Sequence, residues 1–480
     1  MLKLPDPVEF LPLIPEMTLV AGAFALLMLD LFIDARRRVV THVLSIALLV
    51  VVIVLISLGV GGQGTVLSGM FVRDGAADLL KVCIAALSAI SLVYTWPYLR
   101  QRDLYQGEVA VLMLFATAGM MLLVSAGSLV MVYLGLEMLA LCAYALIAID
   151  RDSPVASEAA IKSFVLGSLA SGLLLYGMSL VYGATGTLDL TLIAQAAAVE
   201  GQGTLLITGV VFMVAGIAFK FGGAPFHMWL PDVYHGAPTP VTLFIGSAPK
   251  LAYFGMVWRL LETGAAPLDY DWRYMLALVA AASLVLGNLI AVVQSNLKRL
   301  LAYSTISHVG FLCVGLAGGG GEAGASAAGF YAITYGFMAT AAFGMIAVMS
   351  SRGFEADRVE DFRGLSTRSP WMAFLVLCVM ASLAGVPPFL GFWSKLAVIT
   401  AAVDGGYLWL AILAVVCAVI GAFYYLRVVK AMYFEQADGD APAAGGDRAA
   451  RWVFAANALG LLVVGLGWNR ILAWCEYAFA

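Results

Sequence analysis

The chain has 480 residues, of which 62% are hydrophobic and only 12% charged, and its formal net charge is −4 at pH 7. Soluble domains usually contain about 45–50% apolar and about 25% charged residues. This composition, with a mean hydropathy of +0.97, excludes a soluble globular protein and predicts an all-α polytopic membrane protein. The small net charge says little about partners, and we expect no nucleic acid among them.

Cofactor motifs are missing from the sequence. No Cys-x-x-Cys pair and no dinucleotide or Walker-type glycine motif occurs in a strand–helix context, which argues against iron–sulfur, zinc and nucleotide sites. The four histidines, His42, His227, His235 and His308, show no pairing typical of haem ligation. We therefore expect the chain to bind no cofactor of its own. The six cysteines all lie inside apolar runs, far apart: Cys83, Cys142, Cys313, Cys378, Cys417 and Cys475.

Fourteen apolar windows are long enough to cross a bilayer core, which takes about 20 helical residues. The twelfth is too long for one straight span and contains the sequence GVPPFLGF, so we expect that helix to break. The windows lie near residues 11–33, 39–60, 76–99, 108–125, 127–149, 156–183, 204–232, 238–262, 272–294, 298–317, 325–350, 369–403, 405–433 and 451–473.

Basic residues are distributed unevenly between the two sides of these spans. Fourteen fall on one side and five on the other, and the positive-inside rule assigns the richer side to the cytoplasm. We therefore expect both termini on the periplasmic side of a bacterial inner membrane, with loop 351–369 in the cytoplasm. The fourteen are Arg36, Arg37, Arg38, Arg100, Arg102, Arg151, Lys298, Arg299, Arg352, Arg358, Arg363, Arg368, Arg448 and Arg451, and the five are Lys3, Arg73, Arg259, Arg273 and Arg470.

Two stretches repeat a pattern that is unusual in a membrane helix. FKFGGAPFHMWLPD (219–232) and AGVPPFLGFWSK (384–395) both contain a glycine, Pro-Phe, a tryptophan and a lysine. They lie five spans apart, so the two copies enter the membrane from opposite sides, as in transporters built from inverted repeats with broken helices. We expect one membrane domain, 1–480: a three-helix segment (1–107), two inverted five-helix repeats (108–262 and 272–433), and a linker with a last helix (434–480).

Several charged residues lie inside the spans, although a central charge costs about 2.5–3.5 kcal/mol even on the lenient insertion scale. Glu137, Lys220, Lys250 and Lys395 sit several turns from a span end, which favours a functional role. Lys162 lies two turns into its span, so a structural or a functional role is open. Lys81 follows Asp78 by three residues, which favours a surface pair or snorkelling. Arg427 lies deeper than snorkelling needs, and its role is ambiguous.

A buried lysine holds its proton more weakly than one in water, and a nearby carboxylate stabilises the charged form. Loosening a contact between Glu137 and a lysine would therefore release a proton. If the helix that holds Lys220 resumes in register after its break, His227 lies on nearly the same face. An imidazole there could relay a proton, because it titrates near neutrality.

Four motifs together carry a family resemblance: LGLEMLALCAYAL, FKFGGAPFHMWLPDVYHGAPTPVT, NLKRLLAYSTISHVGF and GVPPFLGFWSK. They resemble the antiporter-like subunits of proton-pumping NADH:quinone oxidoreductase, respiratory complex I. The resemblance covers about residues 10–470. The length, the span count and the lack of a long C-terminal lateral helix are similar to the branch called subunit N, or subunit 2.

The resemblance implies a proton-translocating membrane-arm subunit, with flavin and iron–sulfur clusters in partner subunits of the membrane and peripheral arms, and lipids around it. It implies that Glu137 is the partner of the pumping lysines Lys220, Lys250 and Lys395. It further implies that Lys162 lies near Glu137, and that His227 and His308 relay or modulate the proton. No residue is expected to bind a cofactor or a metal.

Three other functions fit parts of the sequence. A subunit of a multi-subunit cation/proton antiporter shares the PFHMWLP stretch and the lysines, and Na⁺-stimulated exchange would identify it. A passive scaffold of a redox complex predicts that mutations at Glu137 and Lys220 are silent. A quinone-binding enzyme lacks cofactor motifs here and would be detected by quinone photolabelling.

Overall fold

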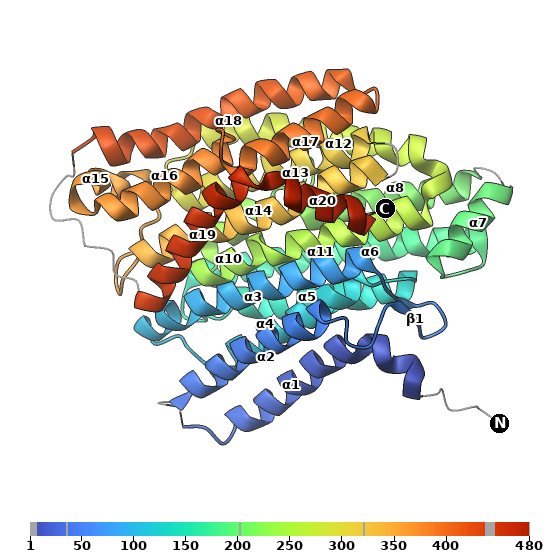
Figure 1. Ribbon diagram of the computed structural model, residues 1–480, viewed down its shortest axis with the longest axis horizontal. Helices are drawn as coiled ribbons and strands as arrows, with labels where there is room; N and C mark the ends of the chain where they lie inside the picture. The colour runs from blue at the N-terminus through green and yellow to red at the C-terminus, as the bar shows by residue number, and fades with distance from the viewer. Residues whose placement is uncertain (1–6, 35–36, 201–202, 320–321, 437–446, 480) are drawn as a thin grey trace.

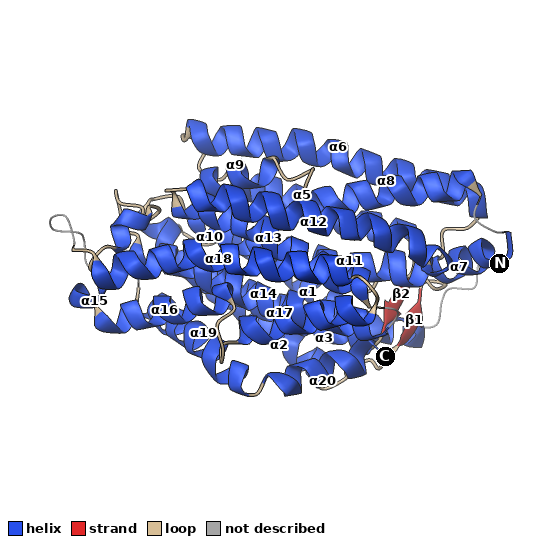
Figure 2. Ribbon diagram, turned by 90° about the horizontal axis from the view of Figure 1, so that it is seen from above, coloured by secondary structure: helices blue, strands red, loops and turns tan. Residues whose placement is uncertain are grey.

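The computed structural model describes residues 7–34, 37–200, 203–319, 322–436 and 447–479. Long helices lie side by side and run in a common direction, with α15 (Leu365–Arg368) near one end of the bundle and α7 (Leu190–Glu200) and β1 (Gly64–Val66) near the other (Figure 1). The prediction of an all-α membrane fold is confirmed by this arrangement. In the part of the chain that is described, strands form one short antiparallel pair, in which β1 pairs with β2 (Phe71–Arg73) so that Gly64 faces Arg73 (Figure 2).

The N-terminal segment and the first half of the bundle follow the predicted windows closely. One element was not expected, the short helix α7, which lies between two spans. The elements are η1 (Pro7–Leu13), α1 (Ile14–Asp30), α2 (Val39–Ser57), β1, β2, α3 (Gly75–Gln101), α4 (Gly107–Val124), α5 (Leu129–Ile147), α6 (Pro154–Thr185), α7, α8 (Thr204–Phe221), α9 (Trp229–Gly236), α10 (Thr239–Gly246), α11 (Ala248–Val257) and η3 (Trp258–Gly264).

The second half of the bundle also matches its windows, and it ends in an extra short helix, α20. Residues 437–446 of the predicted flexible link, 435–451, lie outside the described residues. The elements are η4 (Ala266–Leu268), α12 (Asp269–Val293), α13 (Leu297–Gly318), α14 (Glu322–Met349), η5 (Val359–Phe362), α15, α16 (Pro370–Ala384), α17 (Leu390–Asp404), α18 (Leu408–Phe434), α19 (Arg448–Leu466) and α20 (Trp468–Phe479).

Thirteen helices in the described ranges are long and apolar enough to cross a membrane. The predicted window 369–403 is not among them, because it is divided into α16 and α17. This break agrees with the expectation from the Pro-Pro pair. A fourteenth crossing made by the two halves together, and the inverted repeats, stay predictions.

Side-chain caps define where several of these helices begin. The side chains of Asp74, Ser128, Ser153 and Asn296 accept hydrogen bonds from backbone N–H groups in the first turns of α3, α5, α6 and α13. Such caps satisfy N–H groups that have no partner within the helix. They fix the ends of the spans, and with them the depth of each side chain along its span.

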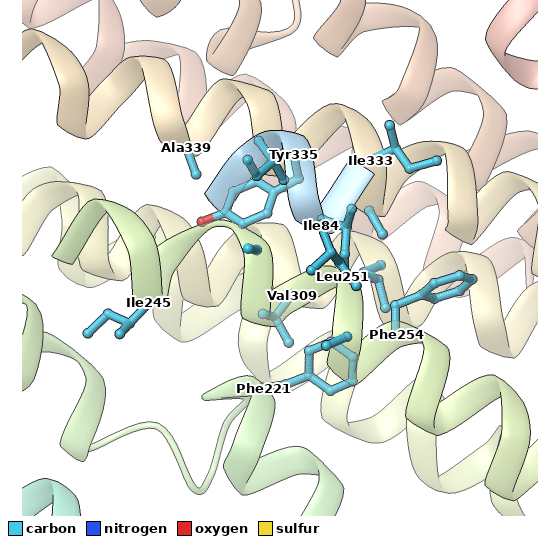
Figure 3. Close-up of a cluster of buried hydrophobic side chains, with 14 of the residues drawn as sticks. Ile84, Phe221, Ile245, Leu251, Phe254, Val309, Ile333, Tyr335 and Ala339 are labelled. Atoms are coloured by element: carbon cyan, nitrogen blue, oxygen red, sulfur yellow. The ribbon is translucent and has the colours of Figure 1, made fainter. Parts of the chain in front are cut away.

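The hydrophobic core joins the two halves of the bundle. Figure 3 shows Phe221 at the end of α8 and Leu251 and Phe254 on α11 close to Val309 on α13 and Ile333 on α14. These side chains are at least 96% buried. The helices α19 and α20 lie across this region and pack on α14, α16 and α3 (Figure 1). The helix end before the first break, at Phe221, is thus held in a packed interior.

Candidate functional site

The first helix break follows α8. Gly222 has a φ of 77°, in the left-handed region that favours glycine. The N–H of Gly223 bonds back to the carbonyl of Ala218 at 2.8 Å, as in a Schellman helix end. The chain resumes as a helix only at α9. The N–H of Ala224 donates to Ser283 Oγ at 2.8 Å, so a side chain of α12 holds the break from the other half of the molecule.

The second break has the same construction. Gly385, directly after α16, has a φ of 83°. The N–H of Val386 bonds back to the carbonyl of Ala381 at 3.0 Å. A Cβ atom at Gly385 would lie 3.0 Å from Cδ of Lys395, so this glycine also makes room for the lysine. The predicted likeness of the two stretches therefore extends to their backbone hydrogen bonds.

Lys220 lies in the last turn of α8 and is almost completely buried. Its Nζ donates to Ser171 Oγ at 2.8 Å and reaches the carbonyl of Gly167 at 3.4 Å, both on α6. The charge of Glu137 acts on this ammonium through space. Lys220 thus has two neutral acceptors and one acidic neighbour that is not bonded to it.

Lys250 lies in the first turns of α11 and is buried. Its Nζ donates to the carbonyl of Phe221 at 2.7 Å, so this lysine binds the C-terminal end of α8, where the helix dipole is negative. A cavity of about 50 Å³ is lined by both Lys220 and Lys250, together with Tyr144, Trp229 and Tyr253. A cavity of this size has room for water beside polar groups. The two lysines therefore line one small cavity whose walls are otherwise mainly apolar.

Glu137 is half-buried on α5. Its Oε1 atom is buried and accepts no hydrogen bond from the described residues. On the same helix, Leu134 and Leu141 are exposed hydrophobic residues three and four positions away, on the same side of the helix. The carboxylate therefore lies at the margin between the interior of the chain and an apolar outer face.

Lys395 lies in the second turn of α17 and is buried. Its Nζ donates to the carbonyls of Leu383 at 2.8 Å and Ala384 at 3.1 Å, the last residues of α16. His308, at the middle of α13, is also buried and lies within electrostatic reach of Lys395. Both imidazole nitrogens have partners, since Nδ1 lies 2.6 Å from Tyr331 Oη and Nε2 lies 3.1 Å from Tyr425 Oη.

The condition for placing His227 on the face of Lys220 is not met. The helix does not resume in register, because a loop separates α8 from α9, and His227 lies in this loop. The imidazole is half-buried, and its Nδ1 has no hydrogen-bond partner among the described residues. His227 thus belongs to the break but not to the face of α8 that carries Lys220.

Lys162 has acidic partners other than Glu137. Its Nζ lies 2.7 Å from Glu158 on the same helix and 2.7 Å from Asp232 on α9. Asp232 also accepts from Arg299 of α13 at 3.2 Å. The side chain of Lys162 is 41% exposed. The ion pairs therefore tie α6 and α13 to the second half of the first broken helix.

The loop at 351–369 is held against the helices through Glu355. This carboxylate accepts from Tyr98 of α3 at 2.8 Å, from Arg102 directly after α3 at 2.7 Å, and from Thr239 at the start of α10. A solvated connector would need no such contacts. The loop therefore fixes the start of α10, which leads to Lys250.

Two basic residues have roles that the sequence does not reveal. The surface role expected for Lys81 is wrong, because its side chain is fully buried and lies 2.6 Å from Glu16 of α1. Arg427 of α18 donates to the carbonyls of Val292, at 2.8 Å, and Gln294 at the C-terminal end of α12. Arg427 is therefore a cap for another helix.

Sequence reasoning missed four polar groups that touch the site. Asp232 bonds Lys162, and Ser171 bonds Lys220. His308 is bonded by Tyr331 and Tyr425. Only Asp232 carried a signal, as the acid that closes the first interrupted stretch. No group of three or more His, Cys, Asp or Glu side chains within the described ranges could hold a metal ion.

Comparisons with known proteins agree with this geometry. Residues 126–421 match the transmembrane family of NADH:quinone oxidoreductases and Mrp antiporters. The NADH-quinone oxidoreductase subunit N of Xanthomonas euvesicatoria pv. vesicatoria (strain 85-10) is 62% identical over 472 residues, which are 98% of this chain and 97% of that relative.

Two solved structures have similar chains. One belongs to respiratory complex I from Thermus thermophilus with bound aureothin, with 32% identity, a TM-score of 0.82, and coverage of 96% of this chain and 98% of that chain. The other belongs to the Mrp complex from Dietzia sp. DQ12-45-1b, with 22% identity, a TM-score of 0.82, and coverage of 98% and 96%, and shows a shared fold alone. By identity and coverage, this chain belongs to the NADH-quinone oxidoreductase subunit N family.

Proposed function

We propose that the chain is a proton-translocating membrane-arm subunit of a respiratory NADH:quinone oxidoreductase. The observation that carries this proposal is the pair of helix breaks, each with a buried lysine bonded to the free carbonyls of a broken helix. Non-helical backbone at membrane depth is tolerated only where it is buried in protein or lines water, and charged side chains retained at that depth mark ion or proton paths. Membership of the subunit N family supports the coupling of this path to NADH oxidation.

The first half of the molecule loads and releases a proton. Lys220 carries the proton while the charge of Glu137 stabilises its ammonium form, and it releases the proton when that influence weakens. The next acceptor is Lys250, which lines the same cavity of about 50 Å³. Among the described residues Lys220 is otherwise held by a hydroxyl and one long carbonyl contact, so its charge state responds to burial and to Glu137.

The second half passes the proton onward. Lys395 and His308 are both buried and close enough to influence each other's charge. A proton on one of them therefore disfavours a proton on the other. Because Lys395 and His308 would both be positive when protonated, the pair favours transfer of a single proton over storage of two.

The chain supplies no redox centre, and the hydride and electron chemistry belongs to flavin- and iron–sulfur-containing partner subunits. Its other partners are neighbouring membrane-arm subunits and lipids. We place it in a bacterial inner membrane with both termini on the periplasmic side, supported by the fourteen-to-five distribution of basic residues.

Co-purification tests the complex. An affinity tag on this chain should recover flavin- and iron–sulfur-containing subunits that oxidise NADH, reduce quinone and acidify one side of reconstituted vesicles. Na⁺-stimulated proton exchange by the chain without redox subunits would instead identify a cation/proton antiporter, whose fold is shared. Recovery of an active redox complex whose pumping is insensitive to Glu137 and Lys220 would identify a scaffold.

Labelling of single cysteines tests the orientation. A cysteine introduced at Arg352, whose side chain is 74% exposed, should react with an impermeant maleimide only after the cells are opened. Labelling of that position in intact cells would reverse the assigned orientation.

A further inference from the structure

His308 lies between two tyrosine hydroxyl groups from different helices. Tyr331 of α14 is 2.6 Å from Nδ1, and Tyr425 of α18 is 3.1 Å from Nε2. All three side chains are at least 98% buried. The line of contacts α18–α13–α14 therefore crosses the interior of the second half without reaching solvent.

The hydrogen-bond chemistry of this trio is directional. A neutral imidazole donates from one nitrogen and accepts at the other, while each phenol can donate and accept. Both observed contacts are satisfied when one tyrosine donates to the ring and the other accepts from it. The line continues beyond Tyr425, whose hydroxyl makes a close contact with Ser304 Oγ. Four polar groups are thus joined in series.

Two other tyrosines of the same helices do not share this arrangement. Tyr335 of α14 stacks near His308, with ring centroids 4.8 Å apart, but its hydroxyl donates to Thr305 at 2.8 Å. Tyr424, next to Tyr425, donates to Asn288 Oδ1 at 3.0 Å. Each helix therefore carries one tyrosine that bonds the imidazole and one that bonds a different side chain.

We propose that Tyr331 and Tyr425 are the direct proton-exchange partners of His308, forming a hydroxyl–imidazole–hydroxyl relay across the second half. The inference rests on the proposed proton-translocating function and assigns two further residues to it. Lys395 lies close enough to act electrostatically on His308. A change in the charge of Lys395 can therefore drive proton movement through the relay.

One transfer through the relay balances as follows, with no change in oxidation state. The O–H bond of Tyr425 breaks as an N–H bond forms at Nε2, Ser304 returns its hydroxyl proton to the Tyr425 oxygen, and a hydrated proton entering the relay restores the proton of Ser304. The Nδ1–H bond breaks as an O–H bond forms on Tyr331, and the former hydroxyl proton of Tyr331 leaves to a water molecule. The ring finishes as its other tautomer, so a second transfer in the same direction requires the ring to turn over.

The four tyrosines supply a matched experiment, because Tyr→Phe removes only the hydroxyl group. In the assembled complex, Tyr425→Phe and Tyr331→Phe should each lower NADH-driven proton pumping and coupled quinone reduction about tenfold, which is less than the roughly 100-fold or more typical of losing a general acid or base. They should also raise the solvent deuterium isotope effect on turnover, because proton transfer becomes rate-limiting. Tyr424→Phe and Tyr335→Phe should keep pumping within about twofold of the native complex and leave the isotope effect unchanged.

Equal behaviour of all four variants, or loss of pumping with an unchanged isotope effect, would overturn the relay and leave the tyrosines as packing residues. His308→Gln separates this inference from the function on which it rests. If His308→Gln is impaired while Tyr425→Phe and Tyr331→Phe pump normally, the relay is wrong and the proposed function stands. If His308→Gln also pumps normally, the role of this half in proton transfer fails as well.

Discussion

The two helix breaks have the same backbone and different surroundings. Each ends in a left-handed glycine followed by an N–H that bonds back five residues, after Phe221 and after Ala384. In the first break the lysine that binds the free carbonyl, Lys250, comes from the neighbouring helix, while Lys220 on the broken helix itself bonds a serine. In the second break Lys395 of the following half-helix binds the carbonyls directly.

This difference separates loading from transfer. The first break has two lysines, a small cavity between them and a carboxylate at the outer margin of the chain, so a change outside the subunit can act on Glu137 and then on Lys220. At the second break Val386 is exposed, but Lys395 itself is buried, and its ammonium bonds only backbone carbonyls and no acid among the described residues. Under the proposed function, the first break would respond to its surroundings and the second would pass the proton on.

The largest expected effect is at Lys220. Lys220→Ala should lower coupled turnover and pumping by about 100-fold, because the carrier of the proton is removed. Lys220→Arg should be nearly as impaired, because a guanidinium does not deprotonate in proteins. Lys430→Ala is the control, since that lysine is 68% exposed. Near-normal pumping by an assembled Lys220→Arg complex would mean that a fixed positive charge suffices.

A smaller loss is expected at Glu137, which acts on Lys220 through space. Glu137→Gln keeps the shape of the side chain and removes its charge. If this weakens the stabilisation of protonated Lys220 by about 1.4 kcal/mol, we expect turnover to fall about tenfold. Glu137→Asp should be milder because the charge remains. Pumping and quinone reduction by membrane vesicles measure both. Normal pumping with glutamine at this position would remove the switching role from the first break.

The two cap glycines should respond differently to alanine. A left-handed non-glycine residue costs about 1–2 kcal/mol, but the new Cβ at Gly222 would also lie 2.2 Å from Leu230, whereas at Gly385 it would lie 3.0 Å from the flexible Lys395 chain. Gly222→Ala should reduce the amount of assembled complex. Gly385→Ala should assemble and pump a few-fold more slowly. Quantitative blotting beside pumping assays separates the two, and equal effects on assembly would contradict the difference.

The smallest effect is expected at Asp232. Asp232→Asn frees Lys162 and Arg299 from α9 but leaves Lys162 its pair with Glu158, and surface ion pairs contribute about 0–1 kcal/mol. Pumping should fall by about twofold to threefold. Glu158→Gln, at a more exposed residue, should have no measurable effect. A larger loss at Glu158 than at Asp232 would show that the contact within α6 matters more than the contact to the broken helix.

The sequence predicted the breaks and their lysines because both are rare in apolar helices. Gly-Gly-Ala-Pro and Gly-Val-Pro-Pro interrupt the hydrogen-bond ladder, and Lys220, Lys250 and Lys395 lie too far from span ends to snorkel. The path of the chain after the break was not predictable. Periodicity gives the phase of a continuous helix, and the loop between α8 and α9 destroys that phase, so periodicity could not place His227.

Contacts between residues far apart in the sequence could not be predicted from helical periodicity either. Lys162 and Asp232 are brought together by the packing of α6 on α9, and Glu16 reaches Lys81 from another helix. Tyr331 and Tyr425 gave no signal, because an aromatic residue inside an apolar span usually only packs. Hydroxyl contacts of this kind depend on the arrangement of three helices, which only the folded chain defines.

The buried pair of Glu16 and Lys81 has a consequence for synthesis. The ribosome delivers α1 to the membrane before α3 exists, so the carboxylate of Glu16 enters without its ammonium partner. Glu16 lies in the first turn of α1, where a lone charge costs less than the roughly 3.5 kcal/mol of the bilayer centre, but the structure buries both groups almost completely between helices. We therefore expect α1 to reach its final packing only when α3 supplies the ammonium, so the first three helices should pack as one unit.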